Sequence, residues 1–387
     1  MLSQEDNNLL TQVGPGTPGG ELMRRYWMPL CPAAELTEAK PTRRVRLFGE
    51  NLVVFRDGRG SYGLVAEQCR HRQASLYFGY VEEDGIRCPY HGWKFDTTGA
   101  CIERPFEHSK NTRIDKCQTA YPVEKLGGIL FGYLGPAPTP LLPRWESLVR
   151  KDGIRSITVL PIHNCNWLQA QENSVDPVHT YWLHAHRLKL LGISKRAQEY
   201  FGRPIESYDF ELCHEPAWSG IRKIRTYGGP NPERELGHPA IFPNVLISPQ
   251  GGIVVSHLRA PIDDEHTYII FSEFAPFEDG HEIDQKDEDI KVKYLEHPKL
   301  PDGEYDLSSF PAQDLMAWET QGSVADRSVE MLGASDRGIV LLRRLLKEQI
   351  SLVQQGGEPV GVIRDPGLND VIRFNLSDRQ KAKRYDP

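Results

Sequence analysis

The chain has 387 residues, of which 39% are apolar and 26% charged, and its formal net charge at pH 7 is −7. This length allows two or three domains that each bury a core. The chain also lacks the excess of basic residues by which proteins bind nucleic acid. No apolar run approaches the roughly 20 residues that cross a bilayer, and the polar start MLSQEDNNLL is unlike a secretory signal. We therefore expect a cytoplasmic protein that binds neither nucleic acid nor a membrane.

The first forty residues contain GPGTPGGELMRRYWMPL, in which Gly14, Gly16 and Gly19 match the GxGxxG spacing of a dinucleotide-binding turn. Two prolines interrupt the pattern and no strand-like run precedes it, so the strand and helix that such a turn joins are not indicated. We interpret the stretch as a turn followed by a short amphipathic helix around Met23 to Trp27. It would belong to an N-terminal helical segment, residues 1–40, that packs on the body of the protein.

From Val45 the pattern changes to short β-like runs: VRLFG, NLVVF, a turn at Asp57-Gly58, then YGLVAE. The pattern closes near GGILFGYLG, and the proline-rich stretch GPAPTPLLPRW follows as a connector. We therefore predict an all-β domain over residues 41–135.

Residues 136–387 combine helical and strand patterns. CNWLQAQENSVDPVHTYWLHAH indicates helix, IFPNVLI, GGIVVSHL and TYIIFSEF indicate strands, and QDLMAWETQG and GIVLLRRLLKEQI indicate helix again. This order predicts an α+β domain in which helices gather against an antiparallel sheet. The charged end, SDRQKAKRYDP, is expected to be a solvated tail.

The seven cysteines are scattered and odd in number, which does not fit a disulfide framework in a chain of this size. Two of them stand in Cys69-x-His71 and Cys88-x2-His91, which offer two thiolates and two imidazoles to one inorganic centre. Structural zinc also uses Cys2His2, but a zinc finger spaces its two histidines together. Mixed pairs fit a [2Fe–2S] cluster in which Cys69 and Cys88 hold one iron and His71 and His91 the other.

Together with the following CPYHGWKFDTTGACIERP, this segment resembles a Rieske domain of the oxygenase type. Respiratory Rieske proteins carry a further cysteine after each half of the motif, where this chain has Ala74 and Tyr90. The resemblance therefore implies a low-potential oxygenase cluster. Cys101 has no histidine partner, and we interpret it as a packing residue.

A second candidate site is Asp176-x2-His179-x4-His184, because two histidines and a carboxylate with open positions bind iron in non-haem ferrous oxygenases. On a regular helix His179 and His186 share a face but lie about 10 Å apart, too far to bind one ion. His184 is nearer, yet it lies about 140° round the helix from His179. We therefore predict a π-bulge or a helix end in this segment.

The segment NCNWLQAQENSVDPVHTYWLH resembles the iron-binding stretch of the Rieske non-haem iron ring-hydroxylating oxygenases, in their phthalate-dioxygenase-like branch. The resemblance extends from GPGTPGGELMRRYW through IFPNVLI to DRSVEMLGASDRGIVLLRR, and it implies a helix-grip-like catalytic domain in which His179 and His184 bind iron. The family's third ligand is a distant aspartate, and Asp314 in FPAQDLMAWETQG matches it. Spacing alone does not choose Asp314 over Asp326 or Asp336.

The resemblance also assigns Asp176 to a bridge between subunits and Asn173 to the substrate pocket. Because the chain has neither a convincing nucleotide fingerprint nor a plant-type ferredoxin run, electrons from NAD(P)H would arrive through a separate reductase, with or without a ferredoxin. They would pass from His91 through Asp176 to His179 between subunits of a homotrimer. We thus expect a terminal oxygenase component that uses O2 to hydroxylate a small aromatic or aryl-alkyl substrate.

Alternatives stay open at this point. An electron-transfer or regulatory Rieske protein would carry the same cluster, and an oxygenase with these ligands either dihydroxylates a ring or removes an O- or N-alkyl group. Pocket candidates, which core packing or a surface position explains equally well, are Phe242, Asn244, Leu246, His257 and Phe271, with Arg203, Arg222, Arg225 and Arg259 for a substrate carboxylate. The sequence does not name the substrate.

Overall fold

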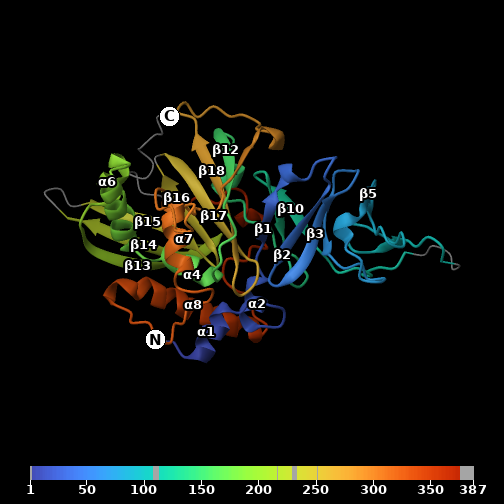
Figure 1. The fold of residues 1–387 in the computed structure, drawn as a ribbon, viewed down its shortest axis with the longest axis horizontal. Helices are drawn as coiled ribbons and strands as arrows, with labels where there is room; N and C mark the ends of the chain where they lie inside the picture. The colour runs from blue at the N-terminus through green and yellow to red at the C-terminus, as the bar shows by residue number, and fades with distance from the viewer. Residues whose placement is uncertain (1, 108–112, 216, 229–232, 251, 375–387) are drawn as a thin grey trace.

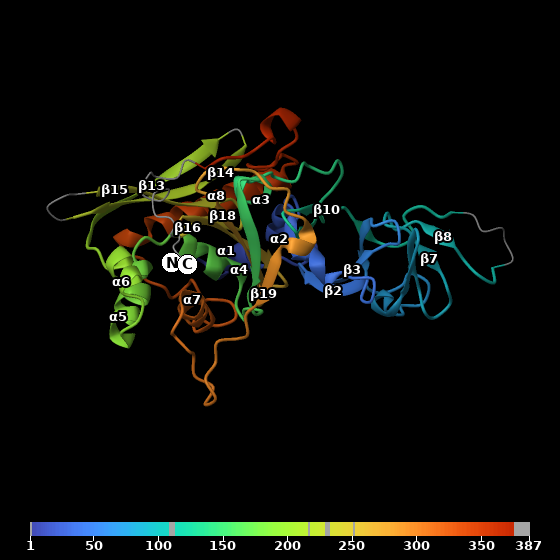
Figure 2. The same ribbon diagram turned by 90° about the horizontal axis from the view of Figure 1, so that it is seen from above.

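The computed structural model describes residues 2–107, 113–215, 217–228, 233–250 and 252–374. Two β-rich regions lie end to end along the longest axis of the molecule, with the smaller region at one end and the larger at the other (Figures 1 and 2). This arrangement confirms the predicted α+β class. The charged stretch predicted to be a tail lies outside the described residues.

Three antiparallel sheets of short strands form the smaller region. One contains β2 (Thr42–Leu47), β3 (Glu50–Arg56), β4 (Tyr62–Ala66) and β9 (Ala120–Tyr121), and another contains β5 (Tyr80–Glu82), β6 (Gly85–Arg87), β7 (Lys94–Phe95) and β8 (Cys101–Glu103). The third joins β1 (Met28–Pro32), β11 (Ile129–Gly132) and β10 (Val123–Leu126). The strands predicted at VRLFG, NLVVF and YGLVAE are confirmed as β2, β3 and β4.

An eight-stranded sheet forms the larger region, in the order β13-β14-β15-β16-β17-β18-β12-β19. Its strands are β12 (Gly153–Val159), β13 (Ile205–Glu215), β14 (Trp218–Tyr227), β15 (Glu233–Ile241), β16 (Val245–Gln250), β17 (Ile253–Pro261), β18 (Thr267–Pro276) and β19 (Lys291–Tyr294). Neighbouring strands pair antiparallel apart from β12 and β19, which run parallel. The antiparallel sheet predicted for this part of the chain is confirmed.

The helices gather against this sheet, with α4 on β15, β16 and β17 and α8 on β14. They are α1 (Gln4–Thr11), α2 (Pro18–Met23), α3 (Glu146–Val149), α4 (Trp167–Ser174), α5 (Arg187–Leu191), α6 (Lys195–Phe201), α7 (Phe310–Glu319) and α8 (Arg337–Gln354), with a π-helix, η3, over Thr180–His186. Short 3₁₀ turns occupy Ala33–Glu35, Leu76–Phe78, Asp287–Asp289, Ala334–Asp336 and Pro366–Leu368. Within the described ranges, no helix is both long enough and apolar enough to span a bilayer.

The helix predicted around Met23 to Trp27 is wrong in position, because α2 ends where that prediction begins. The Thr17 hydroxyl accepts a hydrogen bond from the Gly20 N–H, and Pro18 occupies the first turn, so two start signals place the helix earlier. A Cβ on Gly20 would lie 2.4 Å from the Gly14 carbonyl oxygen. These glycines serve close backbone packing.

One apolar core links the two regions. It includes Leu10 of α1, Met28 of β1, Leu52 of β3, Leu168 of α4 and Leu345 of α8, none of them more than 2% exposed. A close-packed core leaves little room for its side chains to shift. This shared core therefore holds the smaller region in one orientation on the larger.

Candidate metal centres

The four predicted cluster ligands lie on two loops of the smaller region: Cys69, His71, Cys88 and His91. Each loop is closed by a hydrogen bond from the cysteine N–H to the carbonyl five residues later, on Ala74 (2.9 Å) or Trp93 (2.8 Å). The residue four positions after the cysteine, Gln73 or Gly92, donates back to the cysteine carbonyl and has a positive φ, of 61° or 73°. Two segments of different sequence thus fold into the same kind of loop.

The contents of these loops fit a [2Fe–2S] cluster. Cys69 and Cys88 are both buried, and all seven cysteines are free. Burial raises the pKa of the Cys69 thiol to about 12, and the adjacent Cys88 sulfur adds to that rise. Thiols held together in an apolar core suit an inorganic centre that binds them as thiolates. The rings of His71 and His91 are half-buried at the same place, with centroids 4.7 Å apart.

The two predicted iron-binding histidines lie on the π-helix η3. His179 caps its N-terminus and His184 lies within it. Because a π-helix repeats its hydrogen bonds at i→i+5, residues five positions apart face the same side. The predicted distortion is confirmed, and it removes the geometric obstacle to a shared ion.

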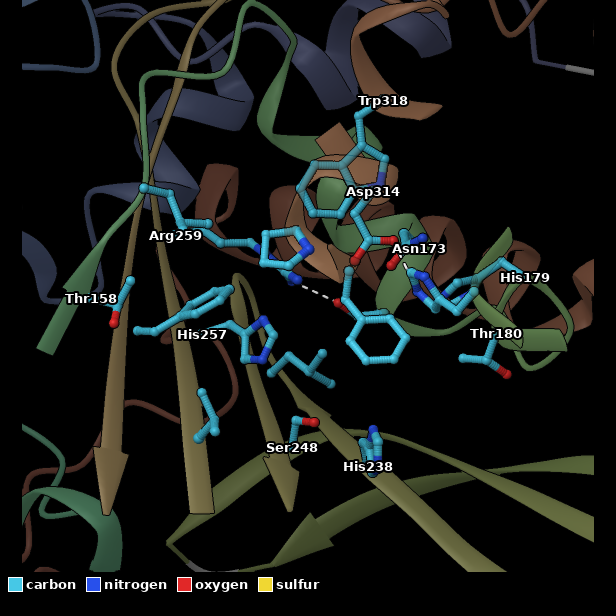
Figure 3. A pocket seen from close by; sticks show the side chains of 18 of the residues that line it. Thr158, Asn173, His179, Thr180, His238, Ser248, His257, Arg259, Asp314 and Trp318 are labelled. Carbon is cyan, nitrogen blue, oxygen red and sulfur yellow. Dashed lines mark hydrogen bonds and ion pairs between the residues drawn. The ribbon is translucent and has the colours of Figure 1, made fainter. Parts of the chain in front are cut away.

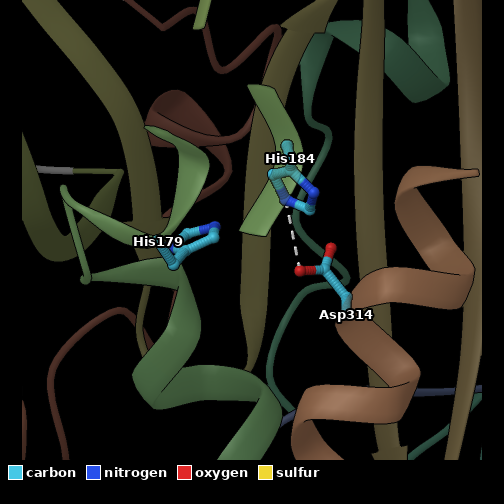
Figure 4. Close-up of side chains that lie close together, drawn as sticks. All are labelled: His179, His184 and Asp314. Carbon is cyan, nitrogen blue, oxygen red and sulfur yellow. Dashed lines mark ion pairs between the residues drawn. The ribbon is translucent and has the colours of Figure 1, made fainter. Parts of the chain in front are cut away.

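His179, His184 and Asp314 each present one ligand atom, and these atoms lie within 4.8 Å of one another (Figure 4). His184 Nε2 is 3.3 Å from Asp314 Oδ1, and the two imidazole centroids are 5.3 Å apart. We call this group the triad. Asp326 and Asp336 lie outside it: they accept hydrogen bonds from Ser328 and Gly333 near the surface.

The triad fits a divalent ion. Asp314 Oδ1 is buried without a hydrogen-bond partner of its own. Burial acts to raise the pKa of this carboxyl, but His184 and then His179 hold that pKa below its usual range. An ionised carboxylate that is buried and unsatisfied is costly, and a cation between the three side chains would remove that cost. Two imidazoles and one carboxylate are the ligand set of non-haem ferrous oxygenases.

Asp176 lies behind His179, in the turn between α4 and η3. Its Oδ1 accepts the N–H groups of Val178 (2.7 Å) and His179 (3.2 Å), and its Oδ2 is 3.6 Å from His179 Nδ1. Burial acts to raise the pKa of this carboxyl, but His179 lowers it well below the usual range. A negative charge therefore faces His179 Nδ1.

A cavity of about 460 Å³ adjoins the triad (Figure 3). Asn173 lines it on the side of Asp314, and Arg259 and His257 line it from β17. Trp318 closes another part of the wall. The cavity thus joins the triad to polar groups of the sheet.

The other candidates for the pocket fall into two sets. Leu246, His257 and Phe271 line the cavity, whereas Phe242 packs on the Tyr26 ring and Asn244 donates to the Arg259 carbonyl.

Among the four candidate arginines, Arg259 lines the cavity. The remaining three form ion pairs within the protein: Arg203 with Glu233, Arg222 with Glu211, and Arg225 with Glu235.

Some residues at the site escaped the sequence analysis. Gln313 lies 2.8 Å from His184 Nδ1, and His238 and Trp318 line the cavity. The only available signal for Gln313 was its position directly before Asp314. His238 and Trp318 resemble core residues in the sequence because strand and helix periodicity does not show which buried face adjoins a cavity.

Two family descriptions match the chain: Rieske [2Fe-2S] domain over residues 26–122, and LigXa C-terminal domain like over residues 294–375. The chain is also 40% identical over 382 residues to the 5,5'-dehydrodivanillate O-demethylase oxygenase subunit of Sphingobium sp. (strain NBRC 103272 / SYK-6), covering 96% of this chain and 86% of the relative. The chain belongs to the Rieske oxygenases.

Other matches agree with this membership. This Rieske oxygenase is 35% identical to phenoxybenzoate dioxygenase subunit alpha of Ectopseudomonas oleovorans, over 91% of this chain and 87% of the relative. The reduced complex between oxygenase and ferredoxin in carbazole 1,9a-dioxygenase has the same fold, with a TM-score of 0.63 at 18% identity, over 97% of this chain and 99% of that one.

Membership confirms that the chain is the terminal oxygenase component and not an electron-transfer or regulatory Rieske protein. It also confirms the predicted Rieske [2Fe–2S] cluster, mononuclear iron and O2 as cosubstrate. The Rieske oxygenases among its relatives include an O-demethylase, a monooxygenase and dioxygenases.

Proposed function

We propose that this oxygenase removes the methyl group from a methoxylated aromatic carboxylate, using iron held by His179, His184 and Asp314. The observation that carries the proposal is a cavity shared by the triad and by Arg259, a buried arginine that forms no ion pair with any residue that the structure describes. The 40% identical relative named 5,5'-dehydrodivanillate O-demethylase supports the reaction type.

Arg259 is 1% exposed, and its Nη1 donates to Gln171 Oε1 and Ser174 Oγ, both at 2.6 Å. Its Nε is buried without a partner, and within the described ranges it forms no ion pair. Burial lowers the pKa of Arg259 to about 10, so the side chain stays positive at neutral pH. A buried cation that forms no ion pair and lines a cavity favours an anionic ligand, and a carboxylate matches its planar fork.

The rest of the wall would accommodate an aromatic ring and its ether. Burial lowers the pKa of His257 to about 3, which keeps this imidazole neutral with its Nε2 free for the ligand. Leu246, Phe271 and Trp318 supply apolar surface. Glu273 does not compete for Arg259, because the Ser156 and Thr158 hydroxyls bind it. The substrate's carboxylate would lie at Arg259 and its methoxy group toward the triad.

His179, His184 and Asp314 would hold a ferrous ion, and that ion would supply the reductive activation of O2 beside the methoxy group. One oxygen atom would enter a methyl C–H bond, and the resulting hemiacetal would collapse to a phenol and formaldehyde. The second oxygen atom would leave as water, which consumes two protons and two electrons. Asn173 and Arg259 would hold the aromatic acid in position through these steps.

The electrons would come from NAD(P)H through a separate reductase, with or without a ferredoxin. Within one chain, the strands β5, β7 and β8 of the region that carries the cluster residues lie at one end of the molecule, well separated along its longest axis from α4 and α7 (Figures 1 and 2). We therefore propose a homotrimer in which His91 of the partner subunit meets Asp176 and, through it, His179. Exposed Trp182 of η3 and exposed Tyr90 beside His91 would become buried in that contact.

We also keep the division of the chain as part of the proposal: an N-terminal segment over residues 1–40, a cluster domain over 41–135 and a catalytic domain over 136–387.

The test is a single turnover of fully reduced, metal-replete protein with ¹⁸O2 and a panel of aromatic acids, with and without methoxy groups, read by mass spectrometry. The proposal predicts a phenol and one equivalent of labelled formaldehyde from a methoxylated acid, and slower conversion of the corresponding neutral methyl ester at the same subsaturating concentration. A cis-diol carrying two labelled atoms would instead establish ring dioxygenation, which the 35% identity to phenoxybenzoate dioxygenase favours as second candidate.

A further inference from the structure

The two nitrogens of the His184 imidazole face two consecutive residues of α7. Its Nδ1 lies 2.8 Å from Gln313 Oε1, and its Nε2 lies 3.3 Å from Asp314 Oδ1. The Phe310 ring meets the same imidazole edge to face, with centroids 4.9 Å apart at 87°. One turn of a helix therefore fixes both the position and the plane of this ring.

The orientation of the Gln313 amide follows from its second partner. The amide Nε2 donates to the Leu307 carbonyl oxygen over 2.8 Å. A carbonyl only accepts hydrogen bonds, so the amide nitrogen must face Leu307 and the amide oxygen must face His184. That oxygen also only accepts, so His184 must carry its proton on Nδ1. In the neutral form of the ring, which is the form that binds a metal, Nε2 is then the nitrogen with a free lone pair, and it is the one that faces Asp314.

The carbonyl that fixes the amide is itself held in place. Leu307 directly follows a hairpin-like segment, residues 297–306, in which the Asp306 N–H donates to Pro298 O. The Tyr305 hydroxyl donates to Glu319 Oε2 over 2.7 Å, and His297 Nε2 lies 3.2 Å from both oxygens of Glu319. Glu319 is the last residue of α7, so the hairpin is tied to both ends of the helix that carries Gln313 and Asp314.

We propose that Gln313 is a positioning residue that fixes the tautomer and orientation of His184 for metal binding. The proposal rests on the proposed role of His184 as an iron ligand. Gln313 is fully buried, so a truncated side chain would leave Nδ1–H without solvent to replace the lost acceptor. Hydrogen-bond partners of ligand imidazoles typically account for about 10-fold to 100-fold in metal affinity.

The experiment compares Gln313→Met, which loses both hydrogen bonds, with Gln313→Glu, which keeps an acceptor toward His184 but loses the donor toward Leu307. Gln321→Met is the matched control, because Gln321 is exposed at the end of the same helix. Each purified holoprotein is challenged with a ferrous chelator, and iron loss is followed over time. The ferrous nitrosyl EPR signal reports the geometry of the site, and the absorbance of the [2Fe–2S] cluster reports folding.

We expect Gln313→Met to lose mononuclear iron about 10-fold to 100-fold faster than the parent, with a changed nitrosyl line shape and unchanged cluster absorbance. Gln313→Glu and Gln321→Met should retain iron at close to the parental rate. If Gln313→Met does not fold, Gln313→Asn, whose shorter amide cannot reach both partners, replaces it with the same expectation.

The proposal would be overturned if Gln313→Met retained iron as long as the parent does. It would also be overturned if Gln313→Met and Gln313→Glu lost iron equally fast, because the hydrogen bond to His184 would then be irrelevant. Asp314→Ala separates this failure from failure of the ligand set. If Asp314→Ala loses iron while Gln313→Met retains it, the triad stands and only the role of Gln313 falls. If Asp314→Ala retains iron, the triad itself is wrong.

Discussion

The loops that carry the cluster residues and the triad are assembled from the sequence in different ways. Each loop is six consecutive residues closed on itself by hydrogen bonds, at Cys69 to Ala74 and at Cys88 to Trp93. The triad joins the π-helix η3 to a helix far along the chain, and its three side chains line the cavity of the larger region. A locally closed site depends on a few backbone bonds, whereas the triad depends on the packing of the whole larger region.

Removing Asp314 would separate the two sites most sharply. In Asp314→Ala the mononuclear site loses its only carboxylate, so we expect iron loss and a fall in turnover of about 10⁴-fold, the scale on which removal of a central catalytic group acts. The cluster should keep its absorbance because its loops close locally. Asp326→Ala is the control, since Asp326 is exposed outside the triad. Loss of cluster absorbance in Asp314→Ala would show that the sites are not independent.

The same contrast explains what could be predicted from the sequence. Short-range features could be predicted. They are the cysteine and histidine pairs, the strands β2 to β4, and the distortion between His179 and His184, which follows from the geometry of a five-residue spacing. Asp314 came only from resemblance, because spacing cannot choose among distant aspartates.

Long-range features were not predictable. The contact of Gln313 with His184 and the opening of Arg259 onto the cavity depend on how α7 and β17 pack, and a single sequence does not encode that packing in any local pattern. The position of α2 was missed for a local reason: the capping signal of Thr17 and Pro18 outweighed the apolar residues from Met23 onward.

A buried ion network around Glu172 offers a way to destabilise the larger region without changing the smaller one. Glu172 of α4 accepts hydrogen bonds from Arg327 Nη2 (2.8 Å), which precedes α8, and from Nε of Arg343 in α8 (2.6 Å). In Arg327→Met the buried carboxylate loses one cation, and we expect a loss of about 3–5 kcal/mol in the free energy of unfolding. The measurement is denaturant unfolding followed by far-UV circular dichroism, with cluster absorbance recorded in parallel.

Arg344→Met is the control for that network, because Arg344 neighbours Arg343 but forms an exposed pair with Glu348. Exposed pairs of this kind contribute about 0.3–0.5 kcal/mol. If Arg327→Met and Arg344→Met lowered the free energy of unfolding equally, the Glu172 carboxylate would not require both Arg327 and Arg343 as partners.

Asp176→Asn tests the connection between the sites. Asparagine keeps an acceptor for the N–H groups of Val178 and His179 but removes the negative charge beside His179 Nδ1. We expect both metal centres to be retained and turnover to fall by about 100-fold, the upper range for loss of a carboxylate partner of a ligand imidazole. Stopped-flow oxidation of the reduced cluster by O2 and substrate measures the step directly.

Asp302→Asn is a suitable control for Asp176→Asn, because Asp302 is an exposed aspartate that accepts a backbone N–H two residues later in the same manner. Parental turnover in a metal-replete Asp176→Asn protein would contradict the relay through Asp176.

The smallest expected effect concerns substrate affinity and leaves both metal sites unchanged. In Arg259→Met the substrate carboxylate loses its cation, so KM for a methoxylated aromatic acid should rise by about 10-fold to 100-fold, as expected for a charge-assisted hydrogen bond of about 1.5–3 kcal/mol. Arg259→Lys should recover part of this loss, since a lysine restores the charge but not the planar fork. Arg203→Met is the control, because Arg203 pairs with Glu233 away from the cavity. If Arg259→Met raised KM equally for the acid and for its neutral methyl ester, Arg259 would shape the cavity without binding a carboxylate.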